Sequence, residues 1–492
     1  MNKNKLLIIV FVCGAVVMVL ELTGSRILAP YVGTSLPVWS ALMGVILGAL
    51  SLGYYFGGRL ADKEPNLNVL ARIILLSAVN IMVLGLIKNP VTALAANSGV
   101  VWGSITACLI LFAPPSMLLG MVSPYTIKLK LENIHQTGNV AGNLYAFSTL
   151  GSIFGTFLAG LGLIPYIKIT NIVFGMSAVL FVLFLFIVDF KIAKKNLYFG
   201  LLFLLWPGMV FMEQNSNYIV DGNTAYSAIK VYDYVDIGNH IVRGLDLNQE
   251  FSSAIYLDSD EMVYEYSKYY RLDNVFTPKI DSALLLGGGA YTLAKDFLQR
   301  NEAGKIDVVE IDPVVTDIAK KYFNLQDDPR LKSYNEDART FVNRATQKYD
   351  AVYVDVFRSR FYVPWHVTTK ETFTNINRIL NDSGVVIINA NNSLSGKGSK
   401  FVWSEYKTLQ SIFPQVFVFG INKEHPEAMQ NVIIVAVKSS QIFNTSIQKK
   451  FSNFEAAKYL DNLYNPLPED LDSAIILTDD YAPVDYFNLE TI

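Results

Sequence analysis

The sequence predicts an N-terminal bundle of about seven transmembrane helices, residues 1–213, followed by a C-terminal α/β region. Within that region we expect a small β-domain, residues 214–275, and a domain with a doubly wound sheet, residues 276–492. The first observation behind this is composition: 52% of the chain is hydrophobic and only 17% is charged, against ~25% charged in soluble domains. Long apolar segments fill the first part, and strand and helix patterns alternate in the last.

Seven segments approach the ~20 apolar residues that cross a bilayer. The first follows two lysines but lacks a small-residue cleavage site, so it reads as a retained helix and not as a signal peptide. The last is short and contains Pro207. We therefore expect a multi-pass cell-membrane protein that contacts the lipid bilayer through Leu6–Leu22, Leu36–Tyr55, Val69–Ile87, Val101–Val122, Val140–Ile164, Ile172–Val188 and Leu197–Met212.

The basic residues of the short loops place the N-terminus in the cytoplasm. An odd number of spans then places the C-terminal region outside, where nucleotide cofactors are scarce. Two readings stay open. Either one segment is re-entrant or miscounted, or the soluble region acts on an exported substrate.

Composition also excludes several kinds of site. The net charge is −3 and the C-terminal half has no broad basic run, which argues against a nucleic-acid partner. Both cysteines lie in apolar segments, so the soluble half has neither a disulfide nor a thiolate metal site. The four histidines are scattered without ligand spacing, so no metal is expected.

The small β-domain is predicted from alternating residues. Ala225–Val235 and His240–Leu247 read as strands joined by a turn at Gly238-Asn239. An aromatic stretch that contains Tyr264 follows and is expected to be helical.

A nucleoside-binding pattern begins at the buried strand Ser282–Leu286, which ends in the triplet Gly287–Gly289. A helix follows, and the next strand, Ile306–Ile311, carries Glu310 about 20 residues past the glycines. Glycines let the backbone approach a nucleotide, and an acid at the next strand end accepts the ribose hydroxyls. The combination predicts a nucleoside site.

The alternation of strands and helices continues and places more acids at strand ends, among them Asp337 and Asp355. Such folds bind ligands at the carboxyl ends of their strands. The last two strands are spaced as an antiparallel hairpin. The predicted strands are Leu331–Tyr334, Asp350–Val354, Val385–Asn389, Val416–Gly420 and Val432–Val437, with helices Lys370–Leu380 and Phe401–Ile412.

These motifs resemble the membrane-fused spermidine synthase-like (polyamine aminopropyltransferase) family, whose soluble domain has the class I methyltransferase-like (Rossmann-like) fold. The resemblance covers most of the chain. It rests on Leu284–Gly289, Val308–Asp312, Asp328–Arg330, Glu336–Ala338, Tyr349–Asp355 and Leu477–Asp485, and in the membrane half on Glu21–Arg26 and Gly57–Asp62.

The resemblance implies roles for residues that match the family motifs. The co-substrate would be decarboxylated S-adenosylmethionine or S-adenosylmethionine, the acceptor a small-molecule amine, and no metal would be needed. A homodimer stays open. Gly287, Gly288 and Gly289 would line the sulfur end of the nucleoside, Glu310 would hold the ribose, Asp337 the adenine amino group with Ala338 near the ring, and Asp355 would be the catalytic acid–base residue.

The sequence departs from the family at two acids. Ala290 follows the glycine triplet and Arg358 follows the catalytic aspartate, where the family usually has aspartates. Two anions that would hold a cationic polyamine are missing, which argues against putrescine as the acceptor. The remaining substrate candidates are Ser252, Gln249, Tyr264, Arg358, His366 and Tyr481.

The first functional hypothesis is a membrane-anchored transferase that moves an aminopropyl group to an amine. The second is an S-adenosylmethionine-dependent methyl- or aminocarboxypropyltransferase on the same fold. The third is a transporter or sensor that binds a nucleoside or polyamine without turnover.

Overall fold

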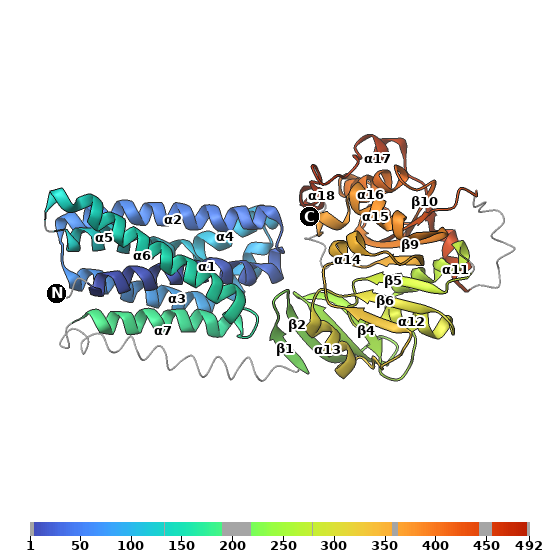
Figure 1. The fold of residues 1–492 in the computed structure, drawn as a ribbon, viewed down its shortest axis with the longest axis horizontal. Helices are drawn as coiled ribbons and strands as arrows, with labels where there is room; N and C mark the ends of the chain where they lie inside the picture. Colours follow the sequence, from blue (N-terminus) through green and yellow to red (C-terminus); the bar gives the residue numbers. More distant parts are fainter. Residues whose placement is uncertain are drawn as a thin grey trace. The chain divides into compact units, whose positions relative to one another are not determined.

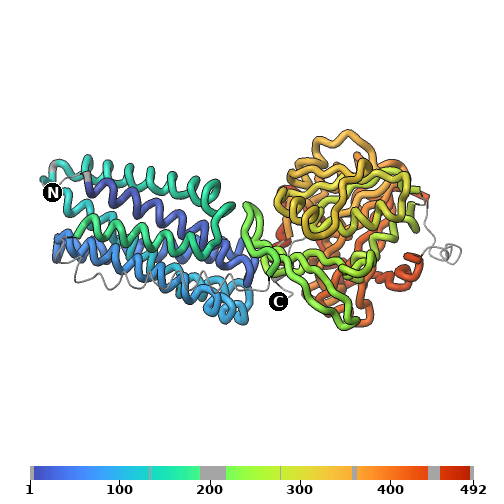
Figure 2. The backbone as a smooth tube through the Cα atoms, turned by 90° about the horizontal axis from the view of Figure 1, so that it is seen from below, coloured from blue at the N-terminus to red at the C-terminus, as the bar shows by residue number. Residues whose placement is uncertain are grey.

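The computed structural model describes residues 4–131, 133–188, 218–277, 279–356, 363–441 and 455–489. The chain divides into two compact units (Figures 1 and 2). One holds the N-terminal helices with residues 222–228, and the other holds residues 218–221 and everything from Ile229 onward.

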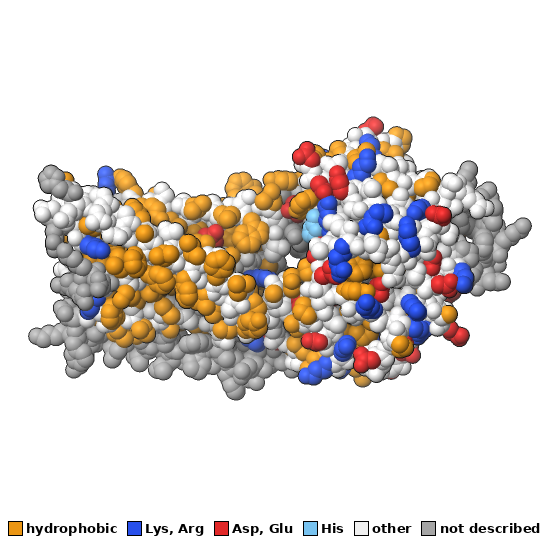
Figure 3. Space-filling view, in the orientation of Figure 1, with side chains coloured by type: hydrophobic (Ala, Val, Ile, Leu, Met, Phe, Trp, Pro, Cys, Tyr) orange, Lys and Arg blue, Asp and Glu red, His pale blue; other side chains and the backbone are white. Residues whose placement is uncertain are grey.

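Within its described residues, the helical unit contains five helices that are long and apolar enough to cross a membrane, or up to six spans if a bent pair counts as one. Exposed apolar side chains cover its visible face (Figure 3). The helices are α1 (Asn4–Val32), α2 (Leu36–Lys63), α3 (Leu67–Ala96), the bent pair α4 (Val100–Leu111) and α5 (Ala113–Lys130), α6 (Thr137–Phe157) and α7 (Ile169–Ile187).

The predicted span Val101–Val122 is not one continuous helix, because α4 and α5 meet at Phe112 with a bend of 52°, as in a broken span or a re-entrant loop. Pro114 and Pro115 lie in the first turn of α5. Proline is tolerated there but cannot continue a preceding helix, which explains the break. The seventh predicted span, Leu197–Met212, lies outside the described residues.

Glycines bring neighbouring helices of this unit into backbone contact. A Cβ atom on Gly57 of α2 would lie 2.6 Å from Cα of Met121 in α5. One on Gly155 of α6 would lie 2.7 Å from Cα of Ala15 in α1. Only glycine fits at these crossings, a form of packing common between helices in membranes.

The second unit begins with a four-stranded sheet in the order β1-β2-β3-β4, in which β2 and β4 each pair antiparallel with β3. The predicted hairpin is confirmed: β2 pairs with β3, and Asn239 in its turn has φ 66°. The fourth strand was not predicted. The strands are β1 (Val220–Asn223), β2 (Ala228–Val235), β3 (Ile241–Leu247) and β4 (Glu250–Tyr256).

The larger sheet has eight strands in the order β12-β10-β11-β9-β8-β5-β6-β7. The five from β7 to β9 are parallel, and β11, β10 and β12 are antiparallel, so the predicted hairpin of β10 and β11 is confirmed. The strands are β5 (Ser282–Leu286), β6 (Lys305–Val309), β7 (Leu331–Tyr334), β8 (Tyr349–Val354), β9 (Leu380–Asn392), β10 (Gln415–Gly420), β11 (Gln430–Val437) and β12 (Leu463–Tyr464).

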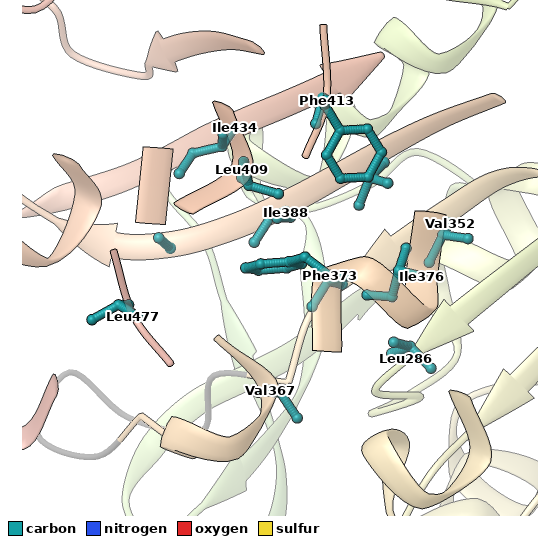
Figure 4. Close-up of a cluster of buried hydrophobic side chains, with 14 of the residues drawn as sticks. Leu286, Val352, Val367, Phe373, Ile376, Ile388, Leu409, Phe413, Ile434 and Leu477 are labelled. Atoms are coloured by element: carbon teal, nitrogen blue, oxygen red, sulfur yellow. The ribbon is translucent and has the colours of Figure 1, made fainter. Parts of the chain in front are cut away.

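Helices cover both faces of this sheet (Figure 1), so its central strands are apolar on both sides. Leu286 and Ile388 face Phe373 of α15 on one side (Figure 4). Ala283 and Leu285 pack on the other side, against the layer that includes α12. The helices are α12 (Thr292–Arg300), α13 (Pro313–Tyr322), α14 (Ala338–Arg344), α15 (Lys370–Ile379) and α16 (Lys400–Gln410), with short helices α10 (Glu265–Lys268), α11 (Asp273–Phe276), α17 (Pro468–Asp472) and α18 (Val484–Leu489).

Candidate active site

The glycine loop after β5 lies directly against the end of β8. Gly287 has φ +94°, and a Cβ atom there would overlap the carbonyl group of Asp355, 2.8 Å from its carbon. Asp355 N also donates to the carbonyl oxygen of Leu286 at 2.8 Å. Because Gly287 has no side chain, Asp355 can lie beside the loop that would hold the nucleoside.

Glu310 follows β6 directly, and its buried carboxylate accepts three backbone hydrogen bonds. Oε2 accepts from Gly288 N at 3.0 Å and from Gly289 N at 3.1 Å, while Oε1 accepts from Asp312 N at 3.0 Å. The predicted ribose ligand and the predicted glycine loop are thus in contact.

Asp355 is partly buried, and Asn389 Nδ2 donates to its Oδ1 at 3.0 Å. Asn389 is oriented in turn by Asn431, whose Nδ2 donates to Asn389 Oδ1 at 3.0 Å. Burial raises the pKa of Asp355 to about 6, while the hydrogen bond from Asn389 acts in the opposite direction. At neutral pH the carboxyl group is ionised, yet basic enough to accept a proton.

Asn389→Leu is expected to move the acidic limb of the pH–activity profile upward. The variant loses the hydrogen bond that lowers the pKa of Asp355, so the carboxylate stays protonated to a higher pH. One hydrogen bond to a charged group corresponds to roughly one pH unit. The measurement is kcat/KM between pH 5 and 9; an unshifted limb in a variant that still binds nucleoside would remove Asn389 from this role.

Asp337 caps the N-terminus of α14 by accepting from Thr340 N at 2.9 Å. His366 Nε2 donates to its other oxygen at 3.1 Å, and this bond lowers the pKa of Asp337 to about 2. Ala338, the next residue, is buried. The structure therefore brings the predicted adenine ligand together with His366, which was predicted only as a substrate contact.

The C-terminal segment lies next to this pair. Arg339 Nη1 donates to the carbonyl oxygen of His366 at 3.0 Å, and the same guanidinium forms an ion pair with Asp479. Tyr481 closes a turn with Thr478 and is 62% exposed. Asp479, and not Tyr481, is thus the residue that fixes this segment beside His366.

Only some of the remaining predicted substrate residues lie at the glycine loop. A Cβ atom on Gly289 would lie 3.8 Å from the hydroxyl of Ser252, so this serine lies at the glycine loop. Gln249 has φ 65° and forms the exposed turn between β3 and β4. Tyr264 lies at the start of α10 and stacks on Tyr266. Arg358 lies outside the described residues.

Three residues at the site were not predicted. Ser253 of β4 accepts from Ala290 N at 3.2 Å and is buried, so the small sheet holds the glycine loop in place. Tyr270 OH donates to the carbonyl oxygen of Val354 at 3.1 Å. Asn389 carried a usable signal, since it is a polar residue at the end of an apolar predicted strand.

Residues 272–449 match the family model described as "Spermine/spermidine synthase domain". This part of the chain is therefore similar to the spermidine synthase family. The family resemblance inferred from its motifs is confirmed.

Two curated relatives are also similar to this chain in sequence. A polyamine aminopropyltransferase of Vibrio vulnificus is 28% identical over 220 residues, covering 42% of this chain and 70% of the relative. Polyamine aminopropyltransferase 1 of Streptomyces coelicolor is 22% identical over 438 residues, covering 82% of this chain and 79% of the relative. The second match is longer than the C-terminal unit and therefore extends into the helical unit.

Two solved structures are also similar to part of this chain. A probable spermidine synthase from Corynebacterium glutamicum has a TM-score of 0.41 at 24% identity, covering 47% of this chain and 84% of that chain. A spermidine synthase in complex with the transition state analogue AdoDATO has a TM-score of 0.42 at 18% identity, covering 52% and 88%.

Proposed function

We propose that this enzyme is a membrane-anchored transferase that moves the aminopropyl group of decarboxylated S-adenosylmethionine to an amine acceptor. One observation carries the proposal: a carboxylate with a pKa of about 6, Asp355, lies against the glycine loop of a spermidine synthase-type domain. The aminopropyltransferase names of the relatives support the same reaction.

The reaction needs a base and a held electrophile. The lone pair of the acceptor nitrogen attacks the aminopropyl carbon bound to the sulfonium, so a C–N bond forms as the C–S bond breaks. The C–S electron pair returns to sulfur and methylthioadenosine leaves. The proton lost by the acceptor nitrogen passes to Asp355, whose negative charge also stabilises the developing ammonium ion.

The remaining residues would bind and orient the nucleoside. Glu310 would accept from the ribose hydroxyls while it holds the glycine loop. Asp337 would accept from the adenine amino group, oriented by His366 and by the helix cap. A donor held in this way would present the aminopropyl carbon bound to the sulfonium for in-line attack by the acceptor nitrogen.

The helical unit would anchor the enzyme in a lipid bilayer. Its helices have the length and apolarity that a membrane span requires, and its glycine crossings are typical of packing between helices in membranes. The similarity to the Streptomyces coelicolor relative extends into this unit.

Product analysis tests the reaction. The full chain, purified in detergent, is incubated with an amine and with either the decarboxylated or the intact donor. Methylthioadenosine from the decarboxylated donor supports aminopropyl transfer. S-adenosylhomocysteine from the intact donor would indicate a methyltransferase instead, and binding without turnover would indicate a sensor or transporter. The intact donor is worth testing because Ala290 is fully buried in an apolar cluster, where the family usually has an acid.

A further inference from the structure

The C-terminal segment, residues 474–479, is bonded along one side of helix α16. Ser404 Oγ accepts from Ile475 N at 3.2 Å, and Thr408 Oγ1 accepts from Leu477 N at 2.9 Å. Both hydroxyl groups belong to buried residues of α16 that are one helical turn apart. The backbone of the segment is therefore held at two successive points by a helix of the core.

Asp479 bonds the end of this segment to α14 and α15. Its carboxylate forms an ion pair with Arg339 of α14 and accepts from Thr369 Oγ1, at the start of α15, at 2.8 Å. Its backbone N–H donates to Glu371 Oε2 in α15 at 3.0 Å. The hydrogen bonds from Arg339 and Thr369 hold the pKa of Asp479 below its ordinary value. Asp479 is thus an anion that joins the C-terminal segment to residues 140 and 110 positions earlier in the chain.

Arg339 links Asp479 to the adenine end of the proposed site. Its Nη1 donates to the carbonyl oxygen of His366 at 3.0 Å, and Thr372 Oγ1 donates to the same oxygen at 2.6 Å. The backbone of His366 is thereby fixed from both α14 and α15. The ring of His366 donates in turn to Asp337 Oδ2 at 3.1 Å. A continuous series of polar contacts thus joins Asp479 to Asp337.

These contacts determine the orientation of Asp337. The hydrogen bond from His366 lowers the pKa of Asp337 to about 2, so the carboxylate is ionised and only accepts hydrogen bonds. An ordinary aspartate, with a pKa of ~3.9, is also ionised at neutral pH, so the charge does not depend on His366. The direction of the two oxygens does, because Thr340 N holds Oδ1 and His366 holds Oδ2. An acceptor fixed in this way favours a base with an amino group over one without it.

We propose that Asp479 is a positioning residue for base recognition. Through Arg339 it holds His366, and His366 holds Asp337 in the orientation that accepts from the 6-amino group of an adenine ring. This inference rests on the proposed function, in which Asp337 binds that amino group. Asp479 itself contacts neither the nucleoside nor the reacting atoms. The C-terminal segment then contributes to donor recognition although it lies beyond residues 272–449, which match the family model.

Two nucleosides that differ only in the 6-amino group report on this orientation. The dissociation constants of methylthioadenosine and of the same nucleoside with purine in place of adenine are measured by calorimetry on the full chain in detergent. The wild type is expected to bind methylthioadenosine about 10- to 100-fold tighter than the purine analogue, the effect of one hydrogen bond to a charged group. In Asp479→Asn this ratio should fall to about threefold or less, because only the affinity for methylthioadenosine decreases.

Two further variants make this result specific. Asp480→Asn removes the same charge from the next residue, whose side chain has no hydrogen-bond or ion-pair partner among the described residues, and should keep the wild-type ratio. Arg339→Lys keeps a positive charge but lacks the fork that reaches both Asp479 and His366, so the ratio should fall as in Asp479→Asn. Wild-type affinity for the purine analogue shows that each variant is folded.

Kinetics separate the positioning role from the reaction. Asp479→Asn should raise the KM for the decarboxylated donor and leave kcat within about twofold of wild type, since the lost contact serves binding. A lower kcat with an unchanged KM would overturn the positioning role, as would equal nucleoside ratios in the wild type and Asp479→Asn. Methylthioadenosine release together with equal ratios leaves the transferase standing without this role. A ratio that falls in Asp479→Asn, with no turnover by the wild type, keeps the role and refutes the transferase.

Discussion

Asp355→Asn is expected to lower kcat by about 10²- to 10⁴-fold, the usual contribution of a positioned general base. Asparagine keeps the shape and the contact of the backbone with the glycine loop but cannot accept a proton from the acceptor. Methylthioadenosine should bind to the variant within about threefold of wild type, because the proposed nucleoside ligands are untouched. Initial rates of methylthioadenosine release measure the first effect and calorimetry the second.

The control for this variant is Asp327→Asn, which removes the same charge from a side chain that is 95% exposed. It should have wild-type kcat. An Asp355→Asn enzyme with more than a tenth of wild-type kcat would mean that water or another group takes the proton.

Glu310→Ala is expected to weaken methylthioadenosine binding by about 100-fold or more, and much more than Asp355→Asn does. The variant loses the acceptor for the ribose and frees the backbone N–H groups of Gly288, Gly289 and Asp312. Hydrogen bonds to a charged group contribute ~1.5–3 kcal/mol each, so a lost ribose contact together with the loss of support for the glycine loop accounts for this effect.

Glu310→Gln separates ribose binding from loop support. Glutamine keeps one oxygen for the glycine loop but presents an NH₂ group in place of the other, so an intermediate loss of about 10-fold is expected. Calorimetry with methylthioadenosine, checked by the thermal unfolding midpoint, measures both variants. Equal losses for Glu310→Ala and Asp355→Asn would mean that Glu310 does not hold the ribose.

The large sheet was predictable because helices cover both of its faces. Strands such as Ser282–Leu286 and Leu331–Tyr334 are short runs bounded by turn residues, and their predicted bounds agree with the structure. The nucleoside motifs were also predictable, because their glycines and acids come at the ends of strands that the sequence pattern identifies.

Other features depend on contacts between distant segments. The strand β4 was missed because its turn uses Asn248 and Gln249, both with positive φ, and contains no glycine. The break between α4 and α5 was missed because Pro114 and Pro115 lie within an apolar run. Ser253 lies in the missed strand β4, and only the folded structure reveals its contact with Ala290 N.

The most direct test is the product formed by the full chain from decarboxylated S-adenosylmethionine and an amine acceptor. We predict methylthioadenosine and an aminopropylated amine in equal amounts, at a rate that falls below pH about 6 as Asp355 becomes protonated. Formation of S-adenosylhomocysteine from the intact donor, with no methylthioadenosine from the decarboxylated one, would contradict it.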